Sequence, residues 1–109
     1  MRTSTRVVAL VCIPLFALSH VGKAETRNIS YKAKCEVCHG STGLADTPTA
    51  KRMMVLPFTD PTVVAKSDSD IIGTIENGSG KMPAYKGKVS EQEINGYIQI
   101  IRQTQNKQH

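Results

Sequence analysis

Residues 35–39 read Cys-Glu-Val-Cys-His, and this stretch decides how the rest of the chain is interpreted. Its two cysteines are three positions apart, and the histidine follows the second one directly. Upstream, Ile29, Tyr31 and Cys35 have a spacing compatible with a short helix. We therefore expect residues 28–39 to be helical and to present the five-residue motif at the end of that helix.

The first 24 residues have the composition of a secretory signal peptide. Two arginines precede an apolar run over residues 7–18, and Gly22 and Ala24 form a small-x-small cleavage site. The run is shorter than the roughly 20 residues that a membrane-spanning helix needs. We expect residues 1–24 to be removed, leaving one domain of residues 25–109 in the periplasm with no transmembrane helix; an uncleaved anchor is the alternative. Cys12, inside the run, is given no role.

The charge of the chain argues against a nucleic-acid-binding protein. The whole sequence has 14 basic and 9 acidic residues, a formal net charge of +5. Arg2, Arg6 and Lys23 leave with the signal peptide, so 11 basic residues face the same 9 acidic ones, a net charge of +2. Nothing in the remainder forms the dense basic patch that nucleic acids require.

The 85 residues after the signal peptide can bury only a modest core. They contain no tryptophan and two cysteines, Cys35 and Cys38. Domains of this size usually need a disulfide, a metal or a cofactor to supplement the core. A disulfide between these two cysteines would close a very small loop and restrain the unfolded chain little. A buried cofactor would stabilise the fold far more.

Residues 40–62 are expected to form one long loop. Glycines and prolines interrupt the segment throughout: Gly40, Gly43, Pro48, Pro57 and Pro61. A loop of this length is unusual in so small a domain, and we interpret it as a segment draped over a bound group.

A second helix is expected after Ser67. Ser67 and Asp70 have the spacing of a capping box, isoleucines follow at positions 71, 72 and 75, and Asn77-Gly78 is a stop signal. The next residues, 78–83, read Gly-Ser-Gly-Lys-Met-Pro and cannot continue a helix. They are expected to form an ordered loop.

The strongest helix prediction lies near the C-terminus. Ser90 and Glu93 form another capping box, and an apolar face at i, i+3, i+4 and i+7 follows: Ile94, Tyr97, Ile98 and Ile101. The polar tail from Gln103 to His109 is expected to fray. No segment alternates with period two. The sequence therefore predicts an all-α fold of about three short helices joined by two loops.

In a secreted protein the C-x-x-C-H spacing predicts covalent attachment of one haem c. The thiols of Cys35 and Cys38 can reach the two vinyl groups of one porphyrin, and the imidazole of His39 can then coordinate the iron. Two other readings are weaker. A thioredoxin-like redox pair belongs in a βαβ context, which is lacking. A zinc site needs four N or S ligands, and the mature chain adds only the distant His109.

The second axial ligand of the iron has three methionine candidates. Met82 is favoured because it lies in the Gly- and Pro-bounded loop between two predicted helices. Met53 and Met54 precede Leu56 and Phe58 and are expected to pad a pocket instead. The metal ligands predicted from sequence are thus His39 and Met82.

Taken together, these motifs resemble those of class I cytochromes c, of the short bacterial monohaem kind. The resemblance covers about Tyr31 to Arg102. It includes the cysteine motif with Gly40 behind it, the Gly43 loop, residues 57–60, the Met82 loop and the final helix.

The resemblance implies several further features of the fold and the site. In this family the first and last helices cross near the haem edge, where Tyr31 and Tyr97 match the aromatic positions. A proline carbonyl accepts a hydrogen bond from the second ring nitrogen of the ligating histidine, and Pro48 stands at that position for His39. Such a bond fixes the ring and raises its basicity. Arg27 departs from the small residue that many members carry at the crossing.

Iron with both axial positions filled by protein is suited to one-electron transfer and not to substrate binding. We therefore expect a monomeric electron carrier and no enzyme activity, acting alone or as the cytochrome subunit of a larger oxidoreductase, with redox proteins as partners. The alternative is a haem enzyme or gas-sensing domain with a labile methionine ligand. Lysines near Met82 are candidates to steer an acidic partner or are simply solvated: Lys81, Lys86 and Lys88.

Overall fold

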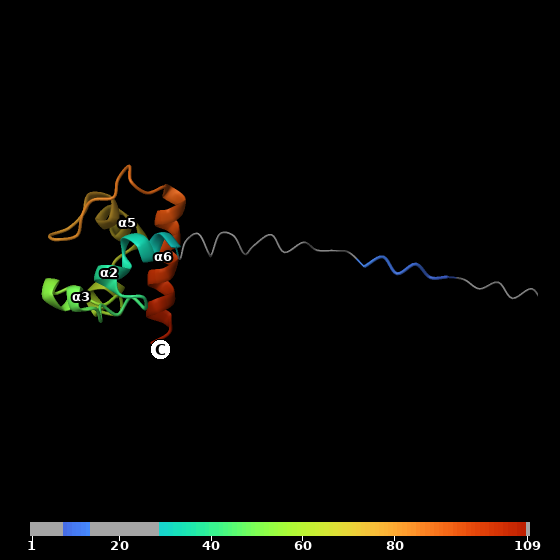
Figure 1. Cartoon of the computed structure of the whole chain (residues 1–109), viewed down its shortest axis with the longest axis horizontal. Coiled ribbons are helices and arrows are strands. Elements are labelled where there is room, and N and C mark those ends of the chain that lie inside the picture. Colours follow the sequence, from blue (N-terminus) through green and yellow to red (C-terminus); the bar gives the residue numbers. More distant parts are fainter. Residues whose placement is uncertain (1–7, 14–28, 109) are drawn as a thin grey trace, which may run out of the picture.

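The fold is a set of short helices arranged around α6, the longest of them (Figure 1). A computed structural model describes residues 8–13 and 29–108. In chain order the helical segments are residues 29–34, α2 (Glu36–His39), α3 (Pro48–Met53), α4 (Pro61–Val64), α5 (Asp68–Asn77) and α6 (Glu91–Asn106). The described residues contain no strand, only an isolated bridge between Ser79 and Met82. The predicted all-α class is confirmed.

Both predicted capping boxes are present. At the start of α5 the Ser67 side chain accepts from the Asp70 backbone N–H, and the Asp70 carboxylate accepts from Ser67 N. Ser90 and Glu93 make the same reciprocal pair at the start of α6. Helix α5 ends before Gly78, which has φ +73°. These boundaries follow the sequence because each is set by hydrogen bonds within a few residues.

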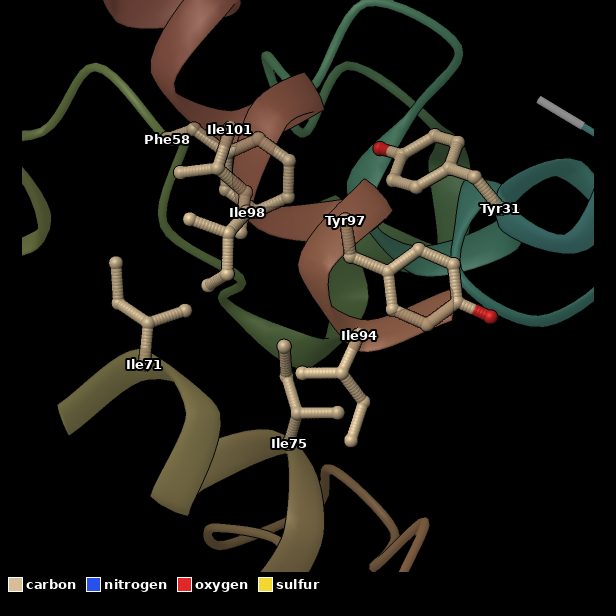
Figure 2. Packing of buried hydrophobic residues seen from close by; sticks show 8 residues of the cluster. All are labelled: Tyr31, Phe58, Ile71, Ile75, Ile94, Tyr97, Ile98 and Ile101. Atoms are coloured by element: carbon tan, nitrogen blue, oxygen red, sulfur yellow. The ribbon is translucent and has the colours of Figure 1, made fainter. Parts of the chain in front are cut away.

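One apolar cluster joins α5, α6 and the chain around the cysteine motif (Figure 2). Ile71 and Ile75 of α5 face the predicted apolar stripe of α6, and Phe58 lies beside Ile98 and Ile101. The full set of buried members is Tyr31, Phe58, Ile71, Ile75, Ile94, Tyr97, Ile98 and Ile101. Each of these side chains retains a few per cent of exposure.

The prediction of a continuous loop over residues 40–62 is wrong, because α3 lies within this segment and α4 begins in it. Pro48 and Pro61 each occupy the first turn of a helix, where a missing N–H costs nothing and the fixed φ is already helical. The side chain of Thr47 accepts from Ala50 N at 3.0 Å, and Asp60 Oδ1 accepts from Thr62 N at 2.9 Å. The prolines therefore begin helices, and the fold has more helices than the three expected.

The prediction that the chain frays from Gln103 is also wrong over most of that tail. Helix α6 continues to Asn106, and Gln105 is buried. Its Nε2 donates to the carbonyl oxygen of Phe58 at 2.9 Å. A polar side chain with a buried partner stabilises this last turn, which the polar composition alone did not indicate.

The predicted crossing of the first and last helices is present. Ser30 and Tyr97 share a hydrogen bond between their hydroxyl groups, and both side chains are buried. The cleavage site predicted after Ala24, and Arg27, lie outside the described residues. Within residues 8–13 and 29–108, no helix has the length and apolar character needed to cross a membrane.

Glu93 bonds to residues on both sides of the crossing between the first helical segment and α6, and its carboxylate makes this contact sensitive to acid. Its Oε1 accepts from Ser30 Oγ at 2.6 Å and lies 3.6 Å from Lys34 Nζ, while Oε2 accepts from Ser90 N at 2.8 Å. The bonds from Ser30 and from Ser90 lower the pKa of Glu93 from 4.5 to about 2. The carboxylate therefore stabilises the fold fully above pH 4.5, and this contribution is lost as the pH falls from 4.5 towards 2.

We expect Glu93→Gln to lower the melting temperature at neutral pH and to flatten its decline between pH 4.5 and 2. The neutral amide cannot pair with Lys34 and does not titrate. Thermal melts across this pH range measure the effect. Glu91→Gln is the matched control, because Glu91 is an exposed carboxylate in the same helical turn. Equal pH dependence in the two variants would contradict the role given to Glu93.

Candidate functional site

The cysteine motif forms one tight turn at the junction of two helical segments. Cys35 lies at the turn between helical residues 29–34 and α2, and its carbonyl accepts from Cys38 N at 3.2 Å and from His39 N at 2.9 Å. Cys35 and Cys38 are both free and half-buried. The backbone thus places Cys35, Cys38 and His39 within one short turn, and their attachment to one bound group stays a prediction.

His39 has a side chain that is suited to be a neutral ligand. Burial lowers the pKa of its imidazole, which keeps the lone pair free at neutral pH. Its Nδ1 is buried and has no hydrogen-bond partner. The ring stacks on Phe58, with centroids 4.9 Å apart and planes at 26°.

The segment after His39 folds back onto the motif. Ala45 N donates to the carbonyl of His39 at 2.9 Å, and the Thr47 hydroxyl donates to the carbonyl of Val37 at 2.9 Å. Pro48 then begins α3, and α3 packs against α2. Pro48 thus directly follows a residue bonded to the motif. Since His39 Nδ1 has no acceptor here, the expected bond to the Pro48 carbonyl stays a prediction.

Tyr31 fixes the other side of this turn. Its hydroxyl donates to the carbonyl of Gly40 at 2.8 Å, and burial raises the pKa of this phenol, so it stays protonated as the donor. Gly40 has φ +81°, and a Cβ there would lie 2.5 Å from Asp46 Oδ1. Only glycine fits the exit from the motif without strain.

Met82 lies in a constrained loop that is anchored to the motif. Met82 and Ser79 exchange two backbone hydrogen bonds, at 2.8 and 3.1 Å. The Tyr85 hydroxyl donates to the carbonyl of Lys34 at 3.0 Å, which joins this loop to the residue just before Cys35. Met82 and Cys35 are both half-buried and both pack against the same apolar cluster. The role of Met82 as an axial ligand remains a prediction.

The other two methionines have different surroundings. Met53 ends α3 and is half-buried. Met54 follows in the left-handed region with φ +53°, and its side chain is 81 % exposed. The expectation that Met54 pads a pocket is therefore wrong.

The alternative chemistries for the cysteines find little support in this geometry. Burial raises the pKa of the Cys35 thiol to about 11, which disfavours the thiolate that zinc binds. Across residues 8–13 and 29–108, no three His, Cys, Asp or Glu side chains gather as a metal site would. The part of the chain that the structure describes has no strand around the motif and so no βαβ unit of the kind in which thioredoxin-like pairs occur.

Two site residues were missed from the sequence. Phe58 contacts the ring of His39, and Tyr85 joins the Met82 loop to the first helical segment. Phe58 lies within residues 57–60, which the family resemblance already included, and Tyr85 follows the Gly- and Pro-bounded Met82 loop.

The residues present fit a covalently bound haem. Two free thiols, the half-buried imidazole that follows them and a methionine loop tied to the residue before Cys35 would supply the attachment points and axial ligands that such a group needs. The all-α fold and this donor set together define a small c-type cytochrome.

Comparison with known proteins gives the family. Residues 23–99 match the family model described as "Cytochrome C oxidase, cbb3-type, subunit III". Cytochrome c6 of Leptolyngbya boryana is 33 % identical over 66 residues, which are 59 % of this chain and 72 % of that protein. The chain belongs to this cytochrome c family, is an electron carrier of the c type, and binds haem c covalently. The family resemblance stated from the sequence is confirmed.

Proposed function

We propose that this protein carries single electrons between redox proteins in the periplasm, with haem c joined to Cys35 and Cys38 and its iron held between His39 and Met82. The observation that carries the proposal is the shared anchoring of both ligand segments. The motif and the Met82 loop meet through the Tyr85–Lys34 bond and pack on one apolar cluster. Haem, when bound there, supplies the one-electron couple of its iron.

The chain contributes rigidity to both proposed ligands. His39 is held by the turn of α2 and by the stack on Phe58. Met82 is held by its paired bonds to Ser79 and by Gly78, where a Cβ would lie 2.6 Å from the Met82 carbonyl oxygen. Ligands that move little between the two oxidation states keep the cost of each electron transfer low.

We propose that the protein is a monomer and that its partners are redox proteins. Exposed lysines flank the Met82 loop and would steer an acidic partner: Lys81, Lys86 and Lys88. If protein side chains occupy both axial positions, the iron has no free site for a substrate. This favours electron transfer over catalysis.

An absorption spectrum of the reduced protein, with and without carbon monoxide, tests this function. We expect a low-spin, six-coordinate spectrum that carbon monoxide leaves unchanged, because Met82 occupies the sixth position. Full-length protein from a host that attaches haem c is the sample. A spectrum that shifts at once on adding carbon monoxide would favour the alternative, a haem enzyme or gas-sensing domain with a labile Met82.

Intact-mass measurement tests the periplasmic location. We expect a mature chain that begins at Glu25 and carries one haem, recovered in the periplasmic fraction, because Gly22 and Ala24 form the cleavage site. A variant with Ala24→Gln is the control, since a large polar residue at this position blocks cleavage. A wild-type species that keeps residues 1–24 would show an anchored protein instead.

A further inference from the structure

An aromatic contact constrains the orientation of the His39 ring. The ring stacks on Phe58, at 4.9 Å between centroids and 26° between planes. The buried Nδ1 has no hydrogen-bond partner among the described residues, and its bond to the Pro48 carbonyl stays a prediction. Near-parallel packing of two aromatic rings restricts rotation of each about its own side-chain bonds.

Phe58 is itself fixed by hydrogen bonds on both sides of its backbone. Its N–H donates to the carbonyl of Gly43 at 2.9 Å, and its carbonyl accepts from Gln105 Nε2 at 2.9 Å. Gly43 also makes room for the ring, because a Cβ at that position would lie 2.4 Å from Phe58 Cδ2. The phenyl ring therefore cannot slide away from His39 without breaking contacts to α6.

The Gln105 side chain is held in turn by Arg102. The Arg102 Nη1 donates to Gln105 Oε1 at 2.9 Å, and its Nη2 donates to the Lys66 carbonyl at 2.7 Å and lies 2.8 Å from Asp68 Oδ1. Gln105 is buried, so its two bonds are protected from competing water. A continuous chain of contacts thus runs from the start of α5, through α6, to the ring of His39.

We propose that Phe58 is a positioning residue that sets the orientation of the His39 imidazole at the iron and keeps water away from it. This inference rests on the proposed role of His39 as an axial ligand. A purely structural role for Phe58 in the apolar cluster predicts only a loss of stability when it is changed. A positioning role also predicts a change in the electronic state and potential of the iron, which respond to the environment of an axial ligand.

Electron paramagnetic resonance of the ferric holoprotein and redox potentiometry test the proposal with Phe58→Leu and Phe58→Tyr. Leucine keeps an apolar side chain but removes the ring that stacks on His39, whereas tyrosine keeps the ring. We expect Phe58→Leu to alter the g values and to favour the ferric form about threefold, a fall in potential of about 28 mV at 59 mV per tenfold change. Phe58→Tyr is expected to retain the wild-type values.

Ile75→Val is the control for an unspecific packing defect, since Ile75 is equally buried in the same cluster. It should lower stability and leave the g values unchanged. Wild-type g values and potential in Phe58→Leu would overturn the proposal. If that variant yields no folded holoprotein, Gln105→Leu replaces it; removal of the bond to the Phe58 carbonyl should shift the g values in the same direction, and no shift there would equally overturn it.

The proposed function and the positioning role fail in different ways. A wild-type ferric protein without a low-spin signal typical of histidine ligation would remove His39 as a ligand before any variant is compared. If the wild-type protein gives the expected low-spin signal and neither Phe58→Leu nor Gln105→Leu changes it, the proposed electron-carrier function stands. Only the positioning role of Phe58 is then contradicted.

Discussion

Met82→Ala is expected to keep the haem covalently attached and to open the iron to external ligands. The attachment points Cys35 and Cys38 are untouched, and the loop retains the backbone bonds of residue 82 to Ser79. Carbon monoxide should bind the reduced variant and cyanide the oxidised one, whereas neither should bind the wild type readily. The potential should fall by on the order of 0.1 V, since axial ligands set haem potentials over a range of about 0.8 V and a thioether favours the reduced iron.

Ligand titration and potentiometry on three variants measure this effect. Met53→Ala and Met54→Ala are the controls, because one residue is half-buried at the end of α3 and the other is exposed. They should stay closed to carbon monoxide and cost a few kcal/mol of stability at most. A Met82→Ala protein that remains six-coordinate at an unchanged potential would show that another residue is the sixth ligand.

The combined change Cys35→Ala with Cys38→Ala is expected to give a chain with little stable helix. No large side chain among the described residues is fully buried, and every buried member of the apolar cluster keeps a few per cent of exposure. Each 100 Å² of apolar surface removed from water contributes about 2.5 kcal/mol. A porphyrin that buries a few hundred Å² therefore supplies as much as the whole stability of a small domain, about 5 kcal/mol at the lower end.

Circular dichroism and thermal melts of this double variant measure the loss. Val37→Ala is the matched control, because Val37 lies between the two cysteines, is exposed and leaves both thiols in place. It should keep its haem and melt cooperatively near the wild-type temperature. Native-like helix content with a cooperative melt in the double variant would show that the polypeptide folds without haem.

The cysteine motif could be recognised because its signal is local. Cys35, Cys38 and His39 lie within one short turn, so their proximity along the backbone follows from sequence order alone. The family comparisons then confirmed the haem that this spacing implied. Met82 was singled out by its neighbours Gly78 and Pro83, and its pairing with Ser79 agrees with an ordered loop.

Local sequence signals predicted the starts of some helices correctly and those of others wrongly. Capping boxes at Ser67 and Ser90 fixed the starts of α5 and α6 through bonds between residues three apart. Thr47-Pro48 and Asp60-Pro61 are start signals of the same kind, because in each an N-cap residue precedes a proline in the first helical turn. The sequence therefore contains the signals for both helices, and the prediction of one continuous loop there is wrong.

By itself the sequence determined the class of fold, the cysteine motif and the caps, because each depends on residues within a few positions of one another along the chain. Only the tertiary structure decided what surrounds His39. Phe58 comes from 19 positions further along the chain, Gln105 reaches Phe58 across 47 residues, and Tyr85 reaches Lys34 across 51. Such pairs form only when closure of the whole chain brings distant segments together, and no local pattern specifies which residues then meet.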